Sequence, residues 1–162
     1  MPESRCQIKI VSGGQTGVDR AALDFAIQHD FKHGGWCPRG RLAEDGVIPP
    51  IYRLRETDLA EYDERTEKNV MGSDATLIAA RDKELSGGTA FTKFCAEKHG
   101  RPLLVVCERD GLGPSTAALS TFLKQNNVRT LNVAGPRQSQ APDLGTFVRA
   151  LLETALGAKL TP

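Results

Sequence analysis

The chain has 162 residues, a formal net charge of +1 at pH 7, 40% hydrophobic residues and 25% charged residues. This length favours a single domain over residues 1–162 with a substantial core, and the balanced charge excludes a global field that would attract nucleic acid or a membrane surface. No apolar run approaches the roughly 18 residues of a membrane span and the N-terminus lacks a signal-peptide segment, so we expect a cytoplasmic protein that binds neither.

Strand-like and helix-like segments alternate along the chain. Runs that are apolar at nearly every position, such as 103–106, predict strands of a parallel sheet covered on both faces, and apolar residues at i, i+3, i+4 and i+7 predict amphipathic helices. The expected strands are 7–11, 35–37, 74–80, 103–106 and 130–134. The expected helices are 17–29, 61–72, 89–100, 114–126 and 142–155.

Two segments depart from this alternation. Residues 38–60 are rich in proline and charge and predict a long loop, which the flanking motifs favour as a functional loop over a solvated insertion. The helix expected at 61–72 carries a polar stripe where an apolar one is usual, formed by Tyr62, Arg65, Thr66 and Asn69. This face is either solvated or directed into a polar site.

The order of elements predicts a Rossmann-like α/β domain of three layers, with a five-stranded, mainly parallel sheet and right-handed crossovers. Such sheets bind ligands beyond the carboxyl ends of their strands, at the switch point. Three strands here end in turns with glycine, at 13–14, 87–88 and 135. If those strands are neighbours, the three turns form one crevice.

The first glycine turn, 13–17, lies between a strand and a helix, where backbone N–H groups and the helix dipole favour an anion. Its spacing differs from G-x-G-x-x-G and it has no P-loop lysine, which disfavours an ordinary dinucleotide oxidoreductase or NTPase. Together with Gly87, Gly88 and Thr89 it predicts a phosphate site. The alternative is two tight turns without a ligand.

Several charged residues are candidates for ligand contacts. Asp19 either complements the helix dipole or accepts hydrogen bonds from a ribose or a heterocycle. Arg39 and Arg41 present guanidinium groups that suit an oxyanion, unless they pair with the nearby acids Glu44 and Asp45.

Neither a catalytic nor a metal-binding constellation is evident. No serine, histidine and acid arrangement suggests a hydrolytic triad, and Cys37, whose pKa nearby arginines would lower, has no base beside it. The four cysteines favour reduced structural thiols, and the three histidines lack metal-ligand spacing, so we expect no protein-ligated metal and no complete active site.

The motifs together resemble the circularly permuted YpsA-like branch of the SLOG superfamily, whose members are often described as molybdenum cofactor carrier proteins. The segments that carry the resemblance are Ser12-Gly-Gly-Gln-Thr-Gly-Val-Asp-Arg20, Gly35-Trp-Cys-Pro-Arg-Gly40, the polar face of 61–72, Ser73-Asp74, Gly87-Gly-Thr89 and Asn132-Val-Ala-Gly-Pro-Arg137.

The resemblance implies a Rossmann-like fold that binds nucleotide-like ligands, usually as a homo-oligomer. It also implies the strand order 35–37, 7–11, 130–134, 74–80, 103–106, which places the three glycine turns side by side. The alternative is a flavodoxin-like order with 130–134 at an edge.

SLOG relatives that hydrolyse nucleoside monophosphates carry a P-G-G-x-G-T-x-x-E loop. The matching stretch, Ser86-Gly-Gly-Thr-Ala-Phe-Thr-Lys93, has neither the proline nor the glutamate. Arg137 still matches the arginine of the family's G-S/P-R turn. These departures disfavour phosphoribohydrolase chemistry.

The sequence and the resemblance lead us to expect a binding or carrier protein for a phosphorylated pterin or nucleotide, such as molybdenum cofactor. Molybdoenzymes or cofactor-synthesis proteins would be its partners. The alternatives are a nucleotide N-glycosidic hydrolase, using Asp19, Glu44 or Asp45, and a nucleotide sensor coupled to a partner protein. The expected site residues are Gly13, Gly14, Gln15, Thr16, Gly17, Asp19, Arg39, Gly40, Arg65, Asn69, Asp74, Gly87, Gly88, Thr89, Gly135, Pro136 and Arg137.

In the expected binding mode, the glycine turns hold a phosphate with Thr16 and Thr89. Arg39, Arg65 and Arg137 balance its charge. Asp19, Asn69 and Asp74 read the hydrogens of the heterocycle or sugar.

Overall fold

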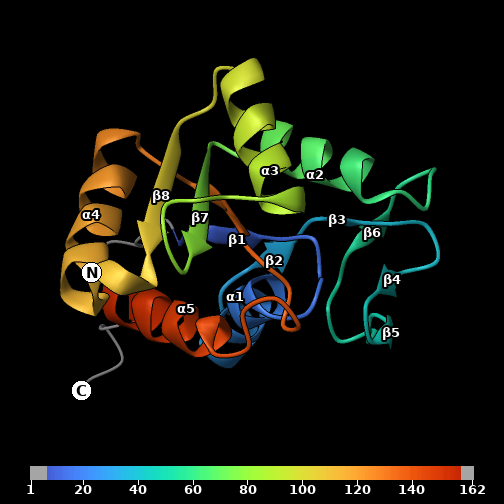
Figure 1. Ribbon diagram of the computed structural model, residues 1–162, viewed down its shortest axis with the longest axis horizontal. Coiled ribbons are helices and arrows are strands. Elements are labelled where there is room, and N and C mark those ends of the chain that lie inside the picture. The colour runs from blue at the N-terminus through green and yellow to red at the C-terminus, as the bar shows by residue number, and fades with distance from the viewer. Residues whose placement is uncertain (1–6, 158–162) are drawn as a thin grey trace, which may run out of the picture.

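The computed structural model describes residues 7–157, in which five parallel strands form a sheet between two layers of helices (Figure 1). Across the sheet the strands are β2 (His33–Gly34), β1 (Lys9–Val11), β9 (Thr130–Ala134), β7 (Ala75–Ala80) and β8 (Leu103–Cys107). The α/β class and the central position of the last strand are confirmed, and the flavodoxin-like order is excluded.

The edge strand lies two residues before its expected position. His33–Gly34 pairs with β1, whereas β3 (Trp36–Cys37) leaves the sheet and pairs with β6 (Arg55–Glu56). The change of direction occurs at Gly35, whose φ of 132° favours glycine. A Cβ there would lie 2.2 Å from the carbonyl oxygen of Ser12. The chain therefore leaves the main sheet at Gly35: residues 33–34 form the edge strand, and residues 36–37 of the expected strand 35–37 pair with β6 instead.

Helices cover both faces of the sheet. One face carries α1 (Val18–Gln28), α4 (Leu112–Gln125) and α5 (Leu144–Leu152), and the other carries α2 (Tyr62–Met71) and α3 (Gly87–Lys98) (Figure 1). A 3-10 turn, Glu108–Asp110, follows β8, and a π-helical turn, Glu153–Gly157, extends α5. All residues of β7 are buried because helices pack on both of its faces. No helix within residues 7–157 is long and apolar enough to cross a membrane.

The segment expected as a long loop is an ordered insertion at one side of the sheet (Figure 1). It contains the antiparallel pair β4 (Leu42–Ala43) and β5 (Gly46–Val47), followed by β6. The guanidinium group of Arg41 organises it by donating hydrogen bonds to four backbone carbonyls, those of Ile48, Pro49, Tyr52 and Leu54. Arg41, a candidate anion contact from the sequence, thus has a structural role.

Candidate ligand-binding site

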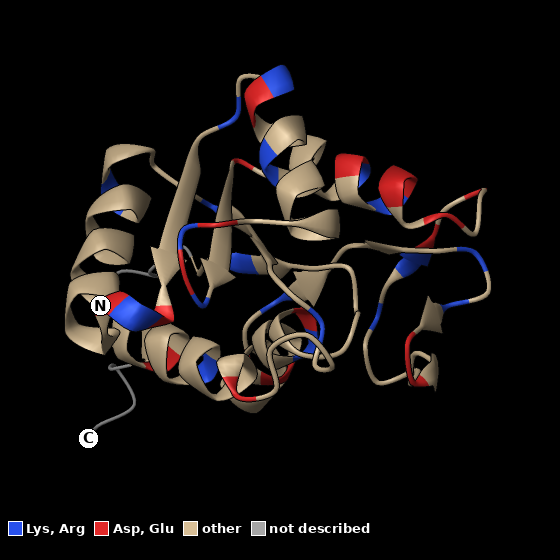
Figure 2. Ribbon diagram, in the orientation of Figure 1, with Lys and Arg blue, Asp and Glu red and all other residues tan. Residues whose placement is uncertain are grey.

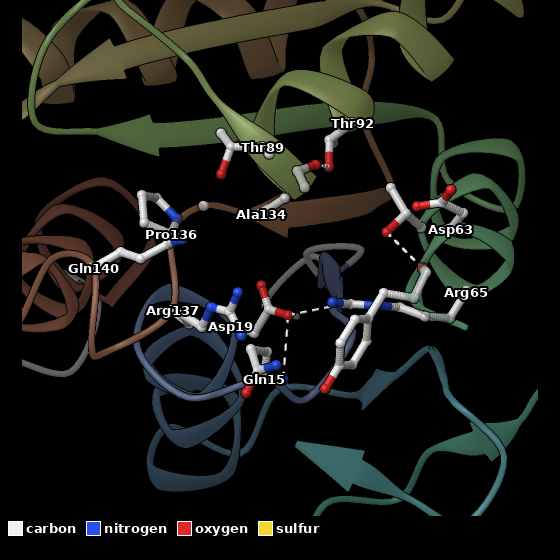
Figure 3. Close-up of a pocket in the computed structure, with 15 residues that line it drawn as sticks. Gln15, Asp19, Asp63, Arg65, Thr89, Thr92, Ala134, Pro136, Arg137 and Gln140 are labelled. Atoms are coloured by element: carbon white, nitrogen blue, oxygen red, sulfur yellow. Dashed lines mark hydrogen bonds and ion pairs between the residues drawn. The ribbon is translucent and has the colours of Figure 1, made fainter. Parts of the chain in front are cut away.

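A cavity of about 130 Å³ opens at the carboxyl ends of β1, β9 and β7, where the three glycine turns meet (Figure 3). We call it the crevice. It is bounded by α1 and the turn after β9 on one side and by α2 and α3 on the other. Its lining residues are Gln15, Asp19, Tyr62, Asp63, Arg65, Thr66, Gly87, Gly88, Thr89, Thr92, Ala134, Gly135, Pro136, Arg137 and Gln140.

A buried ion pair crosses one end of the crevice. The Nη1 atom of Arg65 on α2 lies 3.0 Å from Oδ2 of Asp19 on α1, and the two side chains are 14% and 5% exposed (Figure 3). Burial raises the pKa of the Asp19 carboxyl, and the Arg65 charge opposes this rise. The pair connects helices that lie on opposite faces of the sheet.

Gly13 leaves the room that this ion pair needs. A Cβ at position 13 would lie 1.6 Å from Nη1 of Arg65, so a side chain there would displace the guanidinium group from Asp19. The glycine therefore serves the close approach of a protein side chain, where the sequence suggested the close approach of a ligand.

The first glycine turn uses its own N–H groups internally. The amide of Gln15 donates to Oδ2 of Asp19 over 3.2 Å, and the amide of Thr16 donates to Oε1 of Gln15 over 3.0 Å. The amide of Val18 donates to the carbonyl of Pro136 over 3.4 Å. The carboxylate of Asp19 thus takes the place at the start of α1 that an anion was expected to occupy.

The second glycine turn has the opposite character. No side-chain hydrogen bond caps the start of α3, although the first N–H groups of a helix have no partner within it. Gly87 and Gly88 are exposed, and a Cβ added at either would meet no atom within 4 Å. Thr89 is 7% exposed, faces the crevice, and its hydroxyl forms no hydrogen bond within residues 7–157 (Figure 3).

The third turn closes the crevice from the side of β9. A Cβ at Gly135 would lie 2.5 Å from the carbonyl oxygen of Ala79, so only glycine permits this contact between β9 and β7. Arg137 follows, with its side chain 41% exposed and its Nε 3.9 Å from a carboxylate oxygen of Glu44. Its guanidinium group is directed toward the crevice (Figure 3).

Eight of the expected site residues lie outside the lining, and four of these lie away from the glycine turns and have other partners. Asn69 binds both backbone groups of Trp36, over 2.7 and 3.0 Å. Asp74 lies at the amino end of β7, opposite the crevice, and accepts the amides of residues 129 and 130. Arg39 and Gly40 are exposed in the insertion, where the amide of Gly40 donates to Glu56 over 2.7 Å. These four residues therefore lie away from the crevice, whereas the motifs that carry the family resemblance grouped them with the glycine turns.

The remaining expected residues, Gly13, Gly14, Thr16 and Gly17, shape the first turn without lining the crevice. The φ angles of Gly14 and Gly17 are both 81°, a region that favours glycine. The hydroxyl of Thr16 accepts the amide of Gln138 over 3.0 Å and donates to Glu44. Thr16 thus joins the first and third turns to the insertion.

Glu44 connects the insertion to the crevice. Its carboxylate also accepts the amide and the hydroxyl of Ser139, over 3.1 and 2.5 Å. The hydrogen bonds from Ser139 and Thr16 hold the pKa of the Glu44 carboxyl below its usual value of 4.5. A lowered pKa in the folded state means that this attachment is present above pH 4.5 and is lost as the pH falls through the folded-state pKa.

We expect Glu44→Gln to accelerate hydrogen exchange of the backbone amides of residues 42–48 about fivefold at pH 7. The neutral glutamine side chain cannot replace the charge-assisted hydrogen bonds that the Glu44 carboxylate accepts from Ser139 and Thr16. The difference from the unmodified protein should shrink as the pH is lowered below 4.5, because Glu44 then becomes protonated. Mass spectrometry of exchanged peptides measures both. The control is Asp58→Asn, which changes an exposed acid of the same insertion. Equal exchange in the two variants at pH 7 would contradict the attachment.

The structure adds lining residues that the sequence did not single out as contacts. They are Asp63, Thr92, Ala134 and Gln140. Tyr62 and Thr66 line the crevice as well, so three of the four residues of the polar stripe of α2 face the crevice, and the fourth, Asn69, binds Trp36. Helical spacing could have indicated Thr92, because it follows Gly88 by one helical turn. In the structure its hydroxyl donates to the carbonyl of Gly88 over 2.9 Å.

The cysteines that the structure describes are buried. Cys37 is fully buried, and burial raises the pKa of its thiol, contrary to the lowering suggested by nearby arginines. Cys95 and Cys107 are buried free thiols as well, and Cys6 lies outside the described residues. Among residues 7–157, no group of three or more His, Cys, Asp or Glu is placed to hold a metal ion.

The chain matches a known family over most of its length. The circularly permutated YpsA SLOG family aligns with residues 10–156. A crystal structure described as a putative molybdenum carrier protein from Syntrophus aciditrophicus SB is similar in fold, with a TM-score of 0.90 and 43% sequence identity, covering 93% of this chain and 96% of that one. No curated protein matches significantly. Both the matched residues and this identity establish that the chain belongs to the circularly permutated YpsA SLOG family.

Proposed function

We propose that this protein binds a small phosphorylated heterocycle in the crevice, with the phosphate at the start of α3. The observation that carries the proposal is that the start of α3 lines the crevice: Gly87 and Gly88 leave the backbone open there, and Thr89, 7% exposed, faces the cavity with a hydroxyl that forms no hydrogen bond within residues 7–157. Backbone N–H groups and the positive end of the helix dipole favour a phosphate at this place.

The rest of the crevice fits the other parts of such a ligand. Arg137 supplies a positive charge beside the proposed phosphate position, and its one salt bridge within residues 7–157, to Glu44, is long at 3.9 Å. The ring of Tyr62 lies at the rim, 5.5 Å from the guanidinium carbon of Arg65, and offers a face on which a heterocycle can stack. Asp63 and Gln140 provide polar groups for its edges.

Molybdenum cofactor, a phosphorylated pterin, is the ligand we propose within this class. The similar structure carries the description of a molybdenum carrier, and the open α3 terminus suits the cofactor's phosphate. In this proposal the pterin brings its molybdenum with it, and the chain's own residues bind and orient the phosphate and the ring.

Isothermal titration with molybdenum cofactor and with nucleoside monophosphates tests the proposal. We expect one ligand to bind at micromolar concentration, and Arg137→Gln to weaken it about tenfold by removing one charge-assisted contact. The control is Arg129→Gln, an exposed arginine at the opposite end of β9. Absence of any micromolar ligand, or equal affinities of both variants, would contradict it.

Two carboxylates line the crevice, Asp19 and Asp63, which keeps N-glycosidic hydrolysis as a second candidate. Glu44 and Asp45 do not line it; Asp45 instead pairs with Arg20. The pairing of Asp19 with Arg65 favours binding over catalysis, because the carboxylate already has a partner. Release of free base from nucleoside monophosphates, followed by chromatography, distinguishes the two functions.

A further inference from the structure

A second cavity, of about 310 Å³, lies at the β1–β2 side of the sheet, and its lining shares no residue with the crevice. We call it the basic pocket. It forms where the sheet edge meets β6 and the end of α2. Its charged residues are Lys9, Arg53, Arg55 and Lys68, and no acidic residue lines it. Figure 2 shows the positive charge on β1 and β6.

Three of these charges have no acidic partner. Within residues 7–157, Lys9, Arg53 and Arg55 form no salt bridge, and Lys68 has a single acidic neighbour, Glu64, at 3.6 Å. The whole chain carries a net charge of only +1, so this concentration of positive charge is local. Like charges around a concave surface repel each other unless an anion joins them.

The pocket is held in shape by Trp36. The Nζ of Lys68 lies 4.3 Å from the centre of its ring, and the guanidinium carbon of Arg55 lies 5.8 Å from it, distances at which a cation is attracted to the aromatic face. Asn69, 3% exposed, fixes the backbone of Trp36 through its two hydrogen bonds. Lys68 and Arg55 are therefore positioned by Trp36, which the buried Asn69 holds in place.

His33 lies in the same wall of the pocket. Its Nε2 accepts the amide of Arg53 over 3.1 Å, so its proton resides on Nδ1. Burial, and then the charge of Arg53, lower the pKa of His33 below 6.5, with a smaller contribution from Lys9. Burial is thus the main cause of the lowered pKa of His33, and the charges of Arg53 and Lys9 act in the same direction.

We propose that the basic pocket binds a tetrahedral oxyanion, either free or as the phosphate group of a small metabolite, independently of the crevice. Arg53 and Arg55 provide planar donors that match the oxygens of such a group, and Lys9 and Lys68 provide point charges on either side. The volume exceeds that of the crevice and accommodates the anion with part of an attached molecule.

Trp36 is the only tryptophan of the chain, so its fluorescence monitors the basic pocket directly. The experiment titrates the full-length protein with inorganic phosphate, molybdate and adenosine monophosphate in separate arms. We expect a saturable change in fluorescence, with at least about tenfold weaker binding in Lys9→Gln and in Arg53→Gln, because each removes one charge contact. The matched control is Lys124→Gln on α4, exposed at the far side of the sheet, which should bind as the unmodified protein does.

If phosphate or molybdate binds with the same affinity as adenosine monophosphate, the result supports a free oxyanion as the ligand. If the nucleotide binds more tightly, the result supports a phosphorylated metabolite. The proposal is overturned if no arm saturates, or if Lys9→Gln, Arg53→Gln and Lys124→Gln weaken binding equally. Gly88→Asp, which alters only the crevice, should leave the fluorescence titration unchanged; loss of binding in that variant would place the anion in the crevice and overturn the proposal.

Discussion

Replacing Arg65 by glutamine is expected to lower the free energy of unfolding by about 3–5 kcal/mol, the usual cost of removing one partner of a buried ion pair. The Asp19 side chain is 5% exposed and lies 3.0 Å from the guanidinium group. The substitution leaves this carboxylate buried without a countercharge. Urea denaturation at pH 7, followed by the fluorescence of Trp36, measures the loss.

Two further variants isolate the cause of this loss. Asp19→Asn combined with Arg65→Gln should recover part of the stability, because no unpaired charge remains in the interior. Lys93→Gln is the control. It breaks the ion pair between Lys93 and Glu97, whose two side chains are 50% and 64% exposed, respectively. Its free energy of unfolding should change by less than about 1 kcal/mol. A loss in Arg65→Gln no larger than in this control would refute the role of the pair.

The same variant should also show a characteristic pH dependence. Burial already raises the folded-state pKa of Asp19 above 3.8, and without Arg65 the opposing charge is gone, so the pKa rises further. A raised folded-state pKa means that the folded protein holds the proton more tightly, and stability falls as the pH rises through that pKa. The deficit relative to the unmodified protein should therefore shrink as the pH is lowered from 7 toward 4.

Gly88→Asp is expected to weaken ligand binding at the crevice by about 100-fold while the fold stays intact. The new carboxylate would stand where the proposed phosphate meets α3, and two like charges in one site cost several kcal/mol. The protein itself has room for the side chain, because a Cβ at this position meets no atom within 4 Å. An acidic side chain in the first turn of a helix also interacts favourably with the helix dipole, so the free energy of unfolding should stay the same or rise.

Gly113→Asp provides a closely matched control. Gly113 is the second residue of α4, as Gly88 is of α3, and a Cβ there likewise meets no atom within 4 Å. Both variants gain the same charge at the same helix position, and thermal unfolding should rank them together. Isothermal titration with the nucleotide or cofactor should separate the two variants by their affinities. Equal affinities would show that the start of α3 does not receive the phosphate.

The expectations from sequence succeeded where the signal is local. Apolar runs such as 74–80 and helical spacing such as that of 17–29 predicted β7 and α1 to within about two residues. The position of β9 at the centre of the sheet required the family resemblance, because strand order depends on contacts between distant segments. The insertion at 38–60 was expected as a loop because it is rich in proline and charge and has no sustained period. Its strands are only two residues long and so leave no periodic signal.

Which of the two glycine turns is open to the proposed phosphate could not be predicted from residue types. Turns 13–17 and 87–89 both place glycines between a strand and a helix. Only the first has an acid, Asp19, that folds back onto its amides. Glu44, 28 residues away from Thr16, adds a second attachment to the same turn.

The sequence by itself determined the strand–turn–helix units, the three glycine turns and the family, because periodicity, turn chemistry and motif order are written in neighbouring residues. Only the tertiary structure decided which polar groups are already satisfied and which remain for a ligand. Asp19 and Arg65 are 46 residues apart, and Glu44 and Ser139 are 95 apart. Contacts between such distant charges depend on how the layers pack and have no local signature.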